Sequence, residues 1–238
     1  MKILTRNSIF LILGICSLVF LMAFANIQNN VTVKGVEPII TNNELQYFLT
    51  EQEIKDVVIS LYDSIENIPI REINIGMLED TLESLIYVEN AEVFSSLDGR
   101  LSIVVNQHKA IARIFNGNKH EYLNSMGETM PLSRNHSAMV PFVTGKVKQP
   151  QLEYTHQLLM QATNDPFYEG IITGLDFSNE DILLFSALGN HKIIWGNTNN
   201  TDTKLKKLKI FYQSQEKEDV ANLKTINLMY KDQVVFTN

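Results

Sequence analysis

Cysteine is nearly absent from this chain. Cys16 is the only one among 238 residues, which excludes a disulfide scaffold and a cysteine-rich zinc site. The residues that follow Cys16 contain no thiol. They are therefore compatible with an oxidising compartment, where free thiols would be at risk of wrong disulfides.

Basic residues are also in deficit. The chain has 20 Lys and Arg against 27 Asp and Glu, a formal net charge of −7. A nucleic-acid partner would need a basic patch strong enough to overcome the protein's overall repulsion for phosphate, so none is predicted. One basic cluster exists, and it could contact anionic lipid or an acidic partner. Its interleaved leucines favour lysines on the solvent side of an amphipathic helix: Lys204, Lys206, Lys207 and Lys209.

Familiar catalytic motifs are missing as well. The sequence has no G-x-S-x-G elbow, phosphate-binding loop or G-x-G-x-x-G fingerprint. Its histidines form neither an H-E-x-x-H nor an H-x-H pair and are expected at the surface or in loops: His108, His120, His136, His156 and His191. We predict no metal site, no cofactor and no small-molecule substrate.

Two groups of carboxylates leave one enzymatic alternative open. Residues 79–83 and 176–181 each hold several acidic side chains, and paired carboxylates can hydrolyse glycosidic bonds. An exported cell-wall hydrolase is therefore a weaker alternative. Because no aromatic platform surrounds these residues, a solvated acidic surface is the favoured interpretation, and we predict that the protein is not an enzyme.

One long apolar run lies near the N-terminus. Residues 9–25 (IFLILGICSLVFLMAFA) carry no charge, and a helix of this length is close to the minimum that crosses about 30 Å of hydrocarbon. Lys2 and Arg6 precede the run. The positive-inside rule then places residues 1–8 in the cytoplasm and the rest of the chain outside it.

The leader has two further interpretations. Ala23-Phe24-Ala25 is an A-x-A pattern, so a cleaved signal peptide remains an alternative to a retained anchor. Lipidation of Cys16 is disfavoured, because Ile15 is bulky where a lipoprotein signal needs a small residue.

Residues 31–107 predict a strand-helix-helix-strand-strand unit. Thr50 and Glu53 form a capping box ahead of a helix over 51–64, and Asn74 can cap a second helix. The hydrophobic period then changes from 3.6 to 2, which indicates a hairpin. The predicted strands lie at 31–36, 88–94 and 101–105.

Residues 108–238 predict a mainly antiparallel β domain with two helices, at 152–162 and 203–213. In the second helix, Leu205, Leu208 and Phe211 or Tyr212 are expected to be buried. The alternation of Ile226, Leu228 and Tyr230 predicts a strand at the end of the chain. An uncovered sheet edge accepts a partner strand, so this end is the candidate interaction surface.

The order of these elements resembles the bacterial FtsQ/DivIB cell-division family, whose first exported module is a POTRA domain. In the first unit, V-T-V-K-G at 31–35 resembles the opening strand, L-I-Y-V-E-N-A-E-V at 85–93 resembles the family's P-W-V-x-x-A-x-V segment, and R-L-S-I-V-V at 100–105 resembles the next strand.

The second unit carries more of the resemblance. Y-L-N-S-M-G-E-T-M-P-L at 122–132 is similar to the family's Y-x-D-x-x-G-x-x-x-P segment, and V-P-F-V-T-G at 140–145 follows it. The helix at 204–212 and I-N-L-M-Y-K-D-Q-V-V at 226–235 resemble the family's last helix and its terminal I-D-L-R-Y-x-x-x-V-V strand. The chain departs from the pattern at Tyr87, Ala110, Asn124, Asn227 and Met229.

The resemblance implies an α+β protein with a single N-terminal transmembrane helix, a POTRA domain and an FtsQ-type β domain. It implies a non-catalytic divisome scaffold in the cell inner membrane, with its C-terminal domain periplasmic, that binds FtsB- and FtsL-type proteins at the septum. The alternative is a POTRA-containing envelope biogenesis factor, against which the missing C-terminal barrel argues.

The resemblance also implies where partners bind. The family uses its POTRA domain for recruitment and its last strand for FtsB. The corresponding partner-binding residues here are Tyr230, Lys231, Val234, Val235 and Phe236. Met229 replaces the family's arginine, so apolar anchoring is expected in place of charge pairing. Tyr230 has the same parity as Ile226 and Leu228, and it could point into the core instead.

Overall fold

The computed structural model describes residues 6–28, 31–41, 46–231 and 233–238, with the backbone alone at residues 6–9, 23–28, 217, 218 and 221. Part of the predicted cytoplasmic segment, residues 1–5, therefore lies outside the described residues. The described chain forms two compact units. Unit 1 comprises the residues up to 41 together with 49–107, and unit 2 comprises 46–48 together with 108–238.

Helix α1 (Arg6–Gln28) covers the predicted span at 9–25. Its described side chains, at residues 10–22, are mostly apolar and exposed. Within the described part of the chain, no helix has both the length and the apolar character that crossing a membrane requires. The transmembrane helix expected at 9–25 therefore stays a prediction.

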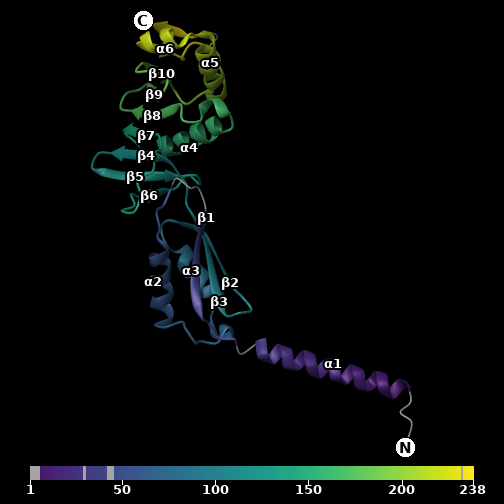
Figure 1. Cartoon of the computed structure of the whole chain (residues 1–238). Coiled ribbons are helices and arrows are strands. Elements are labelled where there is room, and N and C mark those ends of the chain that lie inside the picture. The colour runs from purple at the N-terminus through teal and green to yellow at the C-terminus, as the bar shows by residue number, and fades with distance from the viewer. Residues whose placement is uncertain (1–5, 29–30, 42–45, 232) are drawn as a thin grey trace, which may run out of the picture. The chain divides into compact units, whose positions relative to one another are not determined.

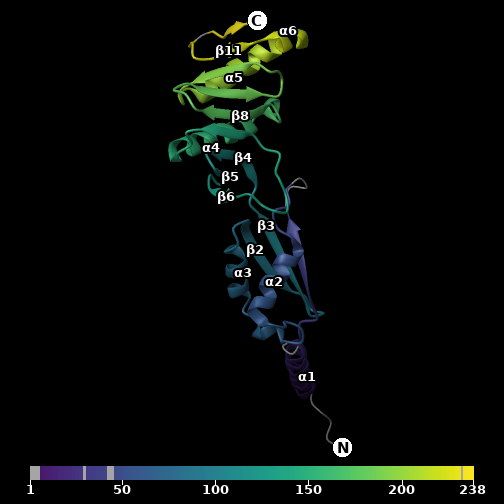
Figure 2. The same ribbon diagram turned by 90° about the vertical axis from the view of Figure 1, so that its left-hand side faces the viewer.

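The rest of unit 1 has the predicted order of elements, with one 3-10 turn added. A three-stranded sheet has the order β1-β3-β2, with β1 parallel and β2 antiparallel to β3 (Figures 1 and 2). The elements are β1 (Gly35–Thr41), α2 (Glu51–Tyr62), η1 (Ile70–Glu72), α3 (Ile75–Glu83), β2 (Val88–Ser95) and β3 (Arg100–Gln107).

Both predicted helix starts in unit 1 are confirmed. The Thr50 hydroxyl accepts a hydrogen bond from the backbone N–H of Glu53 at 3.2 Å, and the Glu53 carboxylate accepts the Thr50 N–H at 2.7 Å. Asn74 Oδ1 accepts the Met77 N–H at 3.1 Å. These side chains satisfy backbone donors that the first turn of a helix leaves without an intrahelical partner.

The first strand lies further along the chain than the sequence predicts. The predicted strand at 31–36 covers Val33, whose N–H donates to the Ile68 carbonyl at 2.9 Å in a loop. The observed strand contains Pro38, which cannot donate a hydrogen bond to a sheet. Because β1 is an edge strand, it tolerates this proline.

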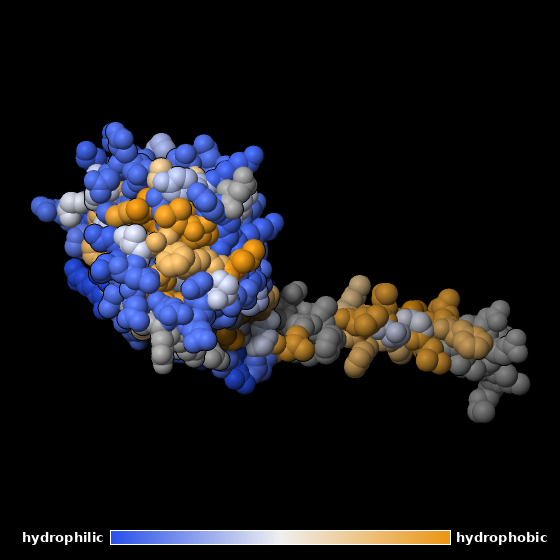
Figure 3. All heavy atoms as spheres, turned by 90° about the horizontal axis from the view of Figure 1, so that it is seen from above, coloured by the Kyte–Doolittle hydropathy of each residue, from blue (hydrophilic) through white to orange (hydrophobic). Residues whose placement is uncertain are grey.

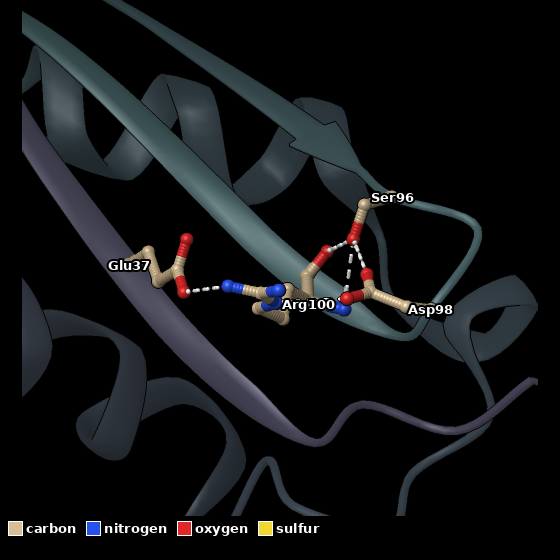
Figure 4. Close-up of polar contacts among 4 residues, drawn as sticks. All are labelled: Glu37, Ser96, Asp98 and Arg100. Carbon is tan, nitrogen blue, oxygen red and sulfur yellow. Dashed lines mark hydrogen bonds and ion pairs between the residues drawn. The ribbon is translucent and has the colours of Figure 1, made fainter.

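A polar cluster ties β1 to the turn between β2 and β3. The Arg100 guanidinium contacts Glu37 at 2.8 Å and Asp98 at 2.9 Å (Figure 4). The Ser96 hydroxyl donates to Asp98 and accepts the Arg100 N–H at 3.0 Å. The hydrogen bond from Ser96, followed by that from Arg100, lowers the pKa of Asp98 to about 2.

Unit 2 contains a nine-stranded sheet in the order β12-β11-β10-β9-β8-β7-β4-β5-β6. Helices α4 and α5 lie against one face of it (Figure 1). The strands are β4 (Ala110–Asn116), β5 (Lys119–Asn124), β6 (Thr129–Pro131), β7 (Phe142–Gly145), β8 (Ile172–Phe177), β9 (Ile182–Ser186), β10 (Lys192–Gly196), β11 (Thr225–Asn227) and β12 (Val235–Thr237). The helices are α4 (Gln149–Thr163), η2 (Pro166–Tyr168), α5 (Thr201–Ser214) and α6 (Lys217–Asn222).

This sheet is mixed, and it has more helical cover than the predicted two helices. The pairs β4–β7, β7–β8 and β10–β11 are parallel. Helix α4 connects β7 to β8, and α5 with the short α6 connects β10 to β11. Because a helical crossover returns the chain to its starting edge, it makes the next strand parallel.

The core of unit 2 lies between the sheet and its helices. Trp195 of β10 is fully buried, and its indole N–H donates to the Tyr154 hydroxyl of α4. Leu205, Leu208, Phe211 and Tyr212 of α5 are all buried, as the periodicity of this helix predicts.

Candidate protein-interaction edge

The predicted terminal strand is divided in two. Strand β11 ends at Asn227, and β12 begins at Val235 and runs antiparallel to β11. Asn227 Oδ1 accepts the Met229 N–H at 2.9 Å, which turns the chain out of the strand. Strand β12 is therefore the last strand at this edge of the sheet.

The hydrogen-bond pattern fixes the direction of the β12 backbone. The Lys192 N–H donates to the Lys224 carbonyl, and the Leu228 N–H donates to the Ile194 carbonyl. This parallel ladder turns the backbone of Ile226 toward β10, so Thr225 and Asn227 face β12. Their register partners are Thr237 and Val235.

It follows that the backbone N–H and C=O of Phe236 point away from the sheet, because backbone groups alternate sides along a strand. The Phe236 side chain lies on the helix-covered face, with its ring centroid 5.3 Å from that of Phe211 in α5. The edge thus offers outward backbone groups and an aromatic side chain at one residue.

A lysine of α5 holds the segment between the two strands. Lys207 Nζ donates to the carbonyls of Leu228 at 3.0 Å and Tyr230 at 2.5 Å. The Met229 side chain passes over Gly196 of β10, where an added Cβ would approach its Cγ to 2.7 Å. These contacts hold residues 228–230 against α5 and β10.

Four apolar side chains between residues 229 and 236 are exposed at this end of the chain. Met229 is 50% exposed, Tyr230 49%, Val235 41% and Phe236 46%. Viewed from the end of unit 2 that carries β11 and the C-terminus, hydrophobic atoms gather within a hydrophilic surround (Figure 3). We refer to these four residues as the edge patch. Such an apolar patch is typical of a protein-interaction surface.

The two remaining predicted partner residues, Lys231 and Val234, differ in their exposure. Lys231 is exposed, whereas Val234 is half-buried and packs against the core. Tyr230 does not follow Ile226 and Leu228 into the core, and its side chain is half-exposed beyond the end of β11. Sequence reasoning missed Lys207 as the residue that holds this segment, since a lysine in an amphipathic helix gives no signal of its acceptor.

The basic run is largely engaged within the protein. Lys204 is buried, donates to the Asn197 carbonyl at 2.7 Å and lies 5.5 Å from the centre of the Trp195 ring. Burial lowers the pKa of Lys204. Lys209 pairs with Asp165 at 2.7 Å and lowers the pKa of that carboxyl. The prediction of a solvated basic face is wrong for Lys204.

The histidines and carboxylates that the structure describes can be compared with their predicted positions. His191 is buried against the Tyr212 hydroxyl at 2.6 Å, contrary to the predicted surface position. Burial lowers the pKa of His191 and raises that of Tyr212 to about 12. Asp176 accepts hydrogen bonds from Thr144 and Ser178. Among the described residues, no three His, Cys, Asp or Glu side chains are grouped to hold a metal ion.

Comparisons with known proteins agree with this architecture. A family model described as FtsQ/DivIB, C-terminal related, matches residues 109–237. A second model, described as a POTRA-like domain, matches residues 32–106. The chain gives no significant match to a curated protein.

Proposed function

The chain belongs to the FtsQ/DivIB family of cell-division proteins, and from this premise we propose that it is a non-catalytic divisome scaffold. In this proposal, residues 31–107 are the POTRA domain that recruits the protein to the septum. Residues 108–238 are the β domain that binds FtsB- and FtsL-type proteins and so links early and late division proteins.

The observation that carries the proposal is the outward backbone of Phe236 beside the edge patch. A partner strand that pairs with β12 gains main-chain hydrogen bonds at this edge, and its side chains contact the patch. Tyr230, Val235 and Phe236 supply apolar contact area, and the exposed Lys231 stands at the rim. Val234 supports the strand from the core side.

Replacing Phe236 with proline tests strand addition. Proline removes the outward N–H and leaves the groups of Val235 and Thr237 that pair with β11. The matched control, Phe236→Val, also loses the ring but keeps the N–H. Capture of the co-expressed FtsB-type protein by the full chain is measured for both. We expect F236P to bind about tenfold more weakly than F236V. Equal binding by both variants would contradict the proposal.

We further propose that residues 9–25 anchor the protein in the cell inner membrane, with the N-terminus cytoplasmic and both domains periplasmic. The support is the uncharged run preceded by Lys2 and Arg6. Intact mass of the protein from carbonate-washed membranes should include residues 1–25. A mass that begins after Ala25 would establish a cleaved leader instead.

Depletion of the protein in its own cells tests the division role. A scaffold that links division proteins is expected to leave filamentous cells with a block in septation. Filaments rescued by the wild-type chain, but not by F236P, would connect the phenotype to the β12 edge. Normal septation on depletion would contradict the proposed role.

A further inference from the structure

Helix α3 covers the outer edge of β2 in unit 1. Strand β2 is the terminal strand opposite β1 in the three-stranded sheet. The Ala91 N–H donates to Glu83 Oε1 at 3.1 Å, and the Val93 N–H donates to Glu79 Oε1 at 2.8 Å. Two edge amides are thus bonded to carboxylates.

The spacing of the two glutamates matches that of the strand. Residues four apart on a helix are about 6 Å apart along its axis. Alternate residues of a strand, whose amides point to the same side, are about 6.8 Å apart. Glu79 and Glu83 therefore reach two successive outward amides, and α3 runs antiparallel to β2. The next acidic residue on this helix, Asp80, is exposed.

The edge beneath this cover has the features of a strand that would otherwise pair. Ile86, Phe94 and Leu97 are exposed apolar residues around β2, at 56%, 50% and 75%. Outward groups at Ala91 and Val93 allow a two-fold pairing with a second copy of the chain, in which each Ala91 is opposite a Val93. Glu92 of the two copies would then meet at the centre.

We propose that Glu79 and Glu83 form an edge lock, which keeps β2 from pairing with the β2 strand of a second copy. The carboxylates occupy the amides that the second strand would use, as natural sheets commonly protect their edges. Like charges of Glu92 at the centre oppose the same pairing. Unit 1 therefore has a β2 edge that opens only when α3 releases it.

Two measurements on the full chain test the edge lock. Hydrogen exchange at the amides of Ala91 and Val93 is compared for wild type, E79A/E83A and the matched control D80A. We expect exchange about tenfold faster in E79A/E83A alone. Alanine is a strong helix former, so α3 should persist in the variant, and circular dichroism verifies this.

The second measurement detects pairing between the β2 strands of two copies by the formation of an intermolecular disulfide. It uses a chain in which Cys16→Ser has removed the native thiol. Glu92→Cys places a thiol at the centre of the two-fold pairing, where Cα atoms of opposite residues lie about 4.5 Å apart and can be bridged. A disulfide dimer is expected with E79A/E83A and not with D80A or with the lock intact. Equal dimer yields in the three backgrounds would overturn the proposal, as would faster exchange without a dimer in E79A/E83A.

Discussion

At the scale of single residues, side chains of one type acquire different roles from the acceptors that the fold brings to them. Lys204 is buried against the Asn197 carbonyl, Lys207 holds the carbonyls of residues 228 and 230, and Lys209 pairs with Asp165. Because all four acceptor residues belong to other elements or loops, the spacing of the lysines does not reveal them. Three of the four lysines that the sequence places in one basic run therefore bond to other groups of unit 2.

The acid titration of Asp98 tests the polar cluster in unit 1. Its pKa is lowered from 3.8 to about 2 by Ser96 and Arg100. A depressed folded-state pKa means that the carboxylate contributes stability fully above pH 4 and loses this contribution as the pH falls toward 2. NMR of the Asp98 carboxyl carbon should give a midpoint near 2, and S96A should raise it. Glu92→Gln is the control and should leave it unchanged; a wild-type midpoint near 3.8 would contradict the assignment.

At the scale of elements, the terminal strands β12 and β2 differ in whether their outward backbone groups are bonded within the protein. Strand β12 presents the backbone of Phe236 beside exposed apolar side chains. Strand β2 has two of its outward amides bonded to glutamates of the adjoining helix. An uncovered edge accepts a further strand, whereas a covered edge does not. Under the two proposals, a partner strand would add at β12 and not at β2.

Gly145 in β7 is a residue whose replacement should destabilise the protein. Its φ is +95°, and an added Cβ would lie 2.3 Å from the backbone N of Ser178. Strain and overpacking together predict a loss of about 3 kcal/mol in unfolding free energy for Gly145→Ala. Gly117→Ala is the control, because φ is +60° there and no atom lies within 4 Å of the added Cβ. Denaturant unfolding should show a smaller loss, about 1 kcal/mol, at Gly117; equal losses would contradict the close-contact argument.

At the scale of the whole molecule, the division into units does not follow the chain order. Residues 46–48 belong to unit 2, although they lie between β1 and α2 of unit 1 in the sequence. The Gln46 side-chain amide exchanges two hydrogen bonds with the backbone of Ala110. Phe48 is fully buried, with its ring centroid 5.5 Å from that of Tyr122. A fragment that begins at residue 108 would lack these contacts.

Phe48→Ala is therefore expected to destabilise unit 2. Removing a buried phenylalanine costs about 3–5 kcal/mol. Trp195 is the only tryptophan and lies buried in β10, so its fluorescence reports the unfolding of unit 2. The midpoint of this transition in denaturant should fall in F48A. Leu82→Ala, in the core of unit 1, is the control; a larger shift in L82A than in F48A would contradict the assignment of Phe48.

The sequence by itself determined the elements whose signals are local. The capping box at Thr50, the cap at Asn74 and the apolar face of α5 lie within a few residues of one another, so their periodicity and capping were readable. The tertiary structure alone decided which strands are parallel, where β1 lies, the outward direction of Phe236, the acceptors of Lys207 and the unit to which Phe48 belongs. Each of these features depends on contacts between residues that are distant in the chain. The hydrophobic pattern of a segment indicates its secondary structure and its buried face, but not which distant segment it will contact.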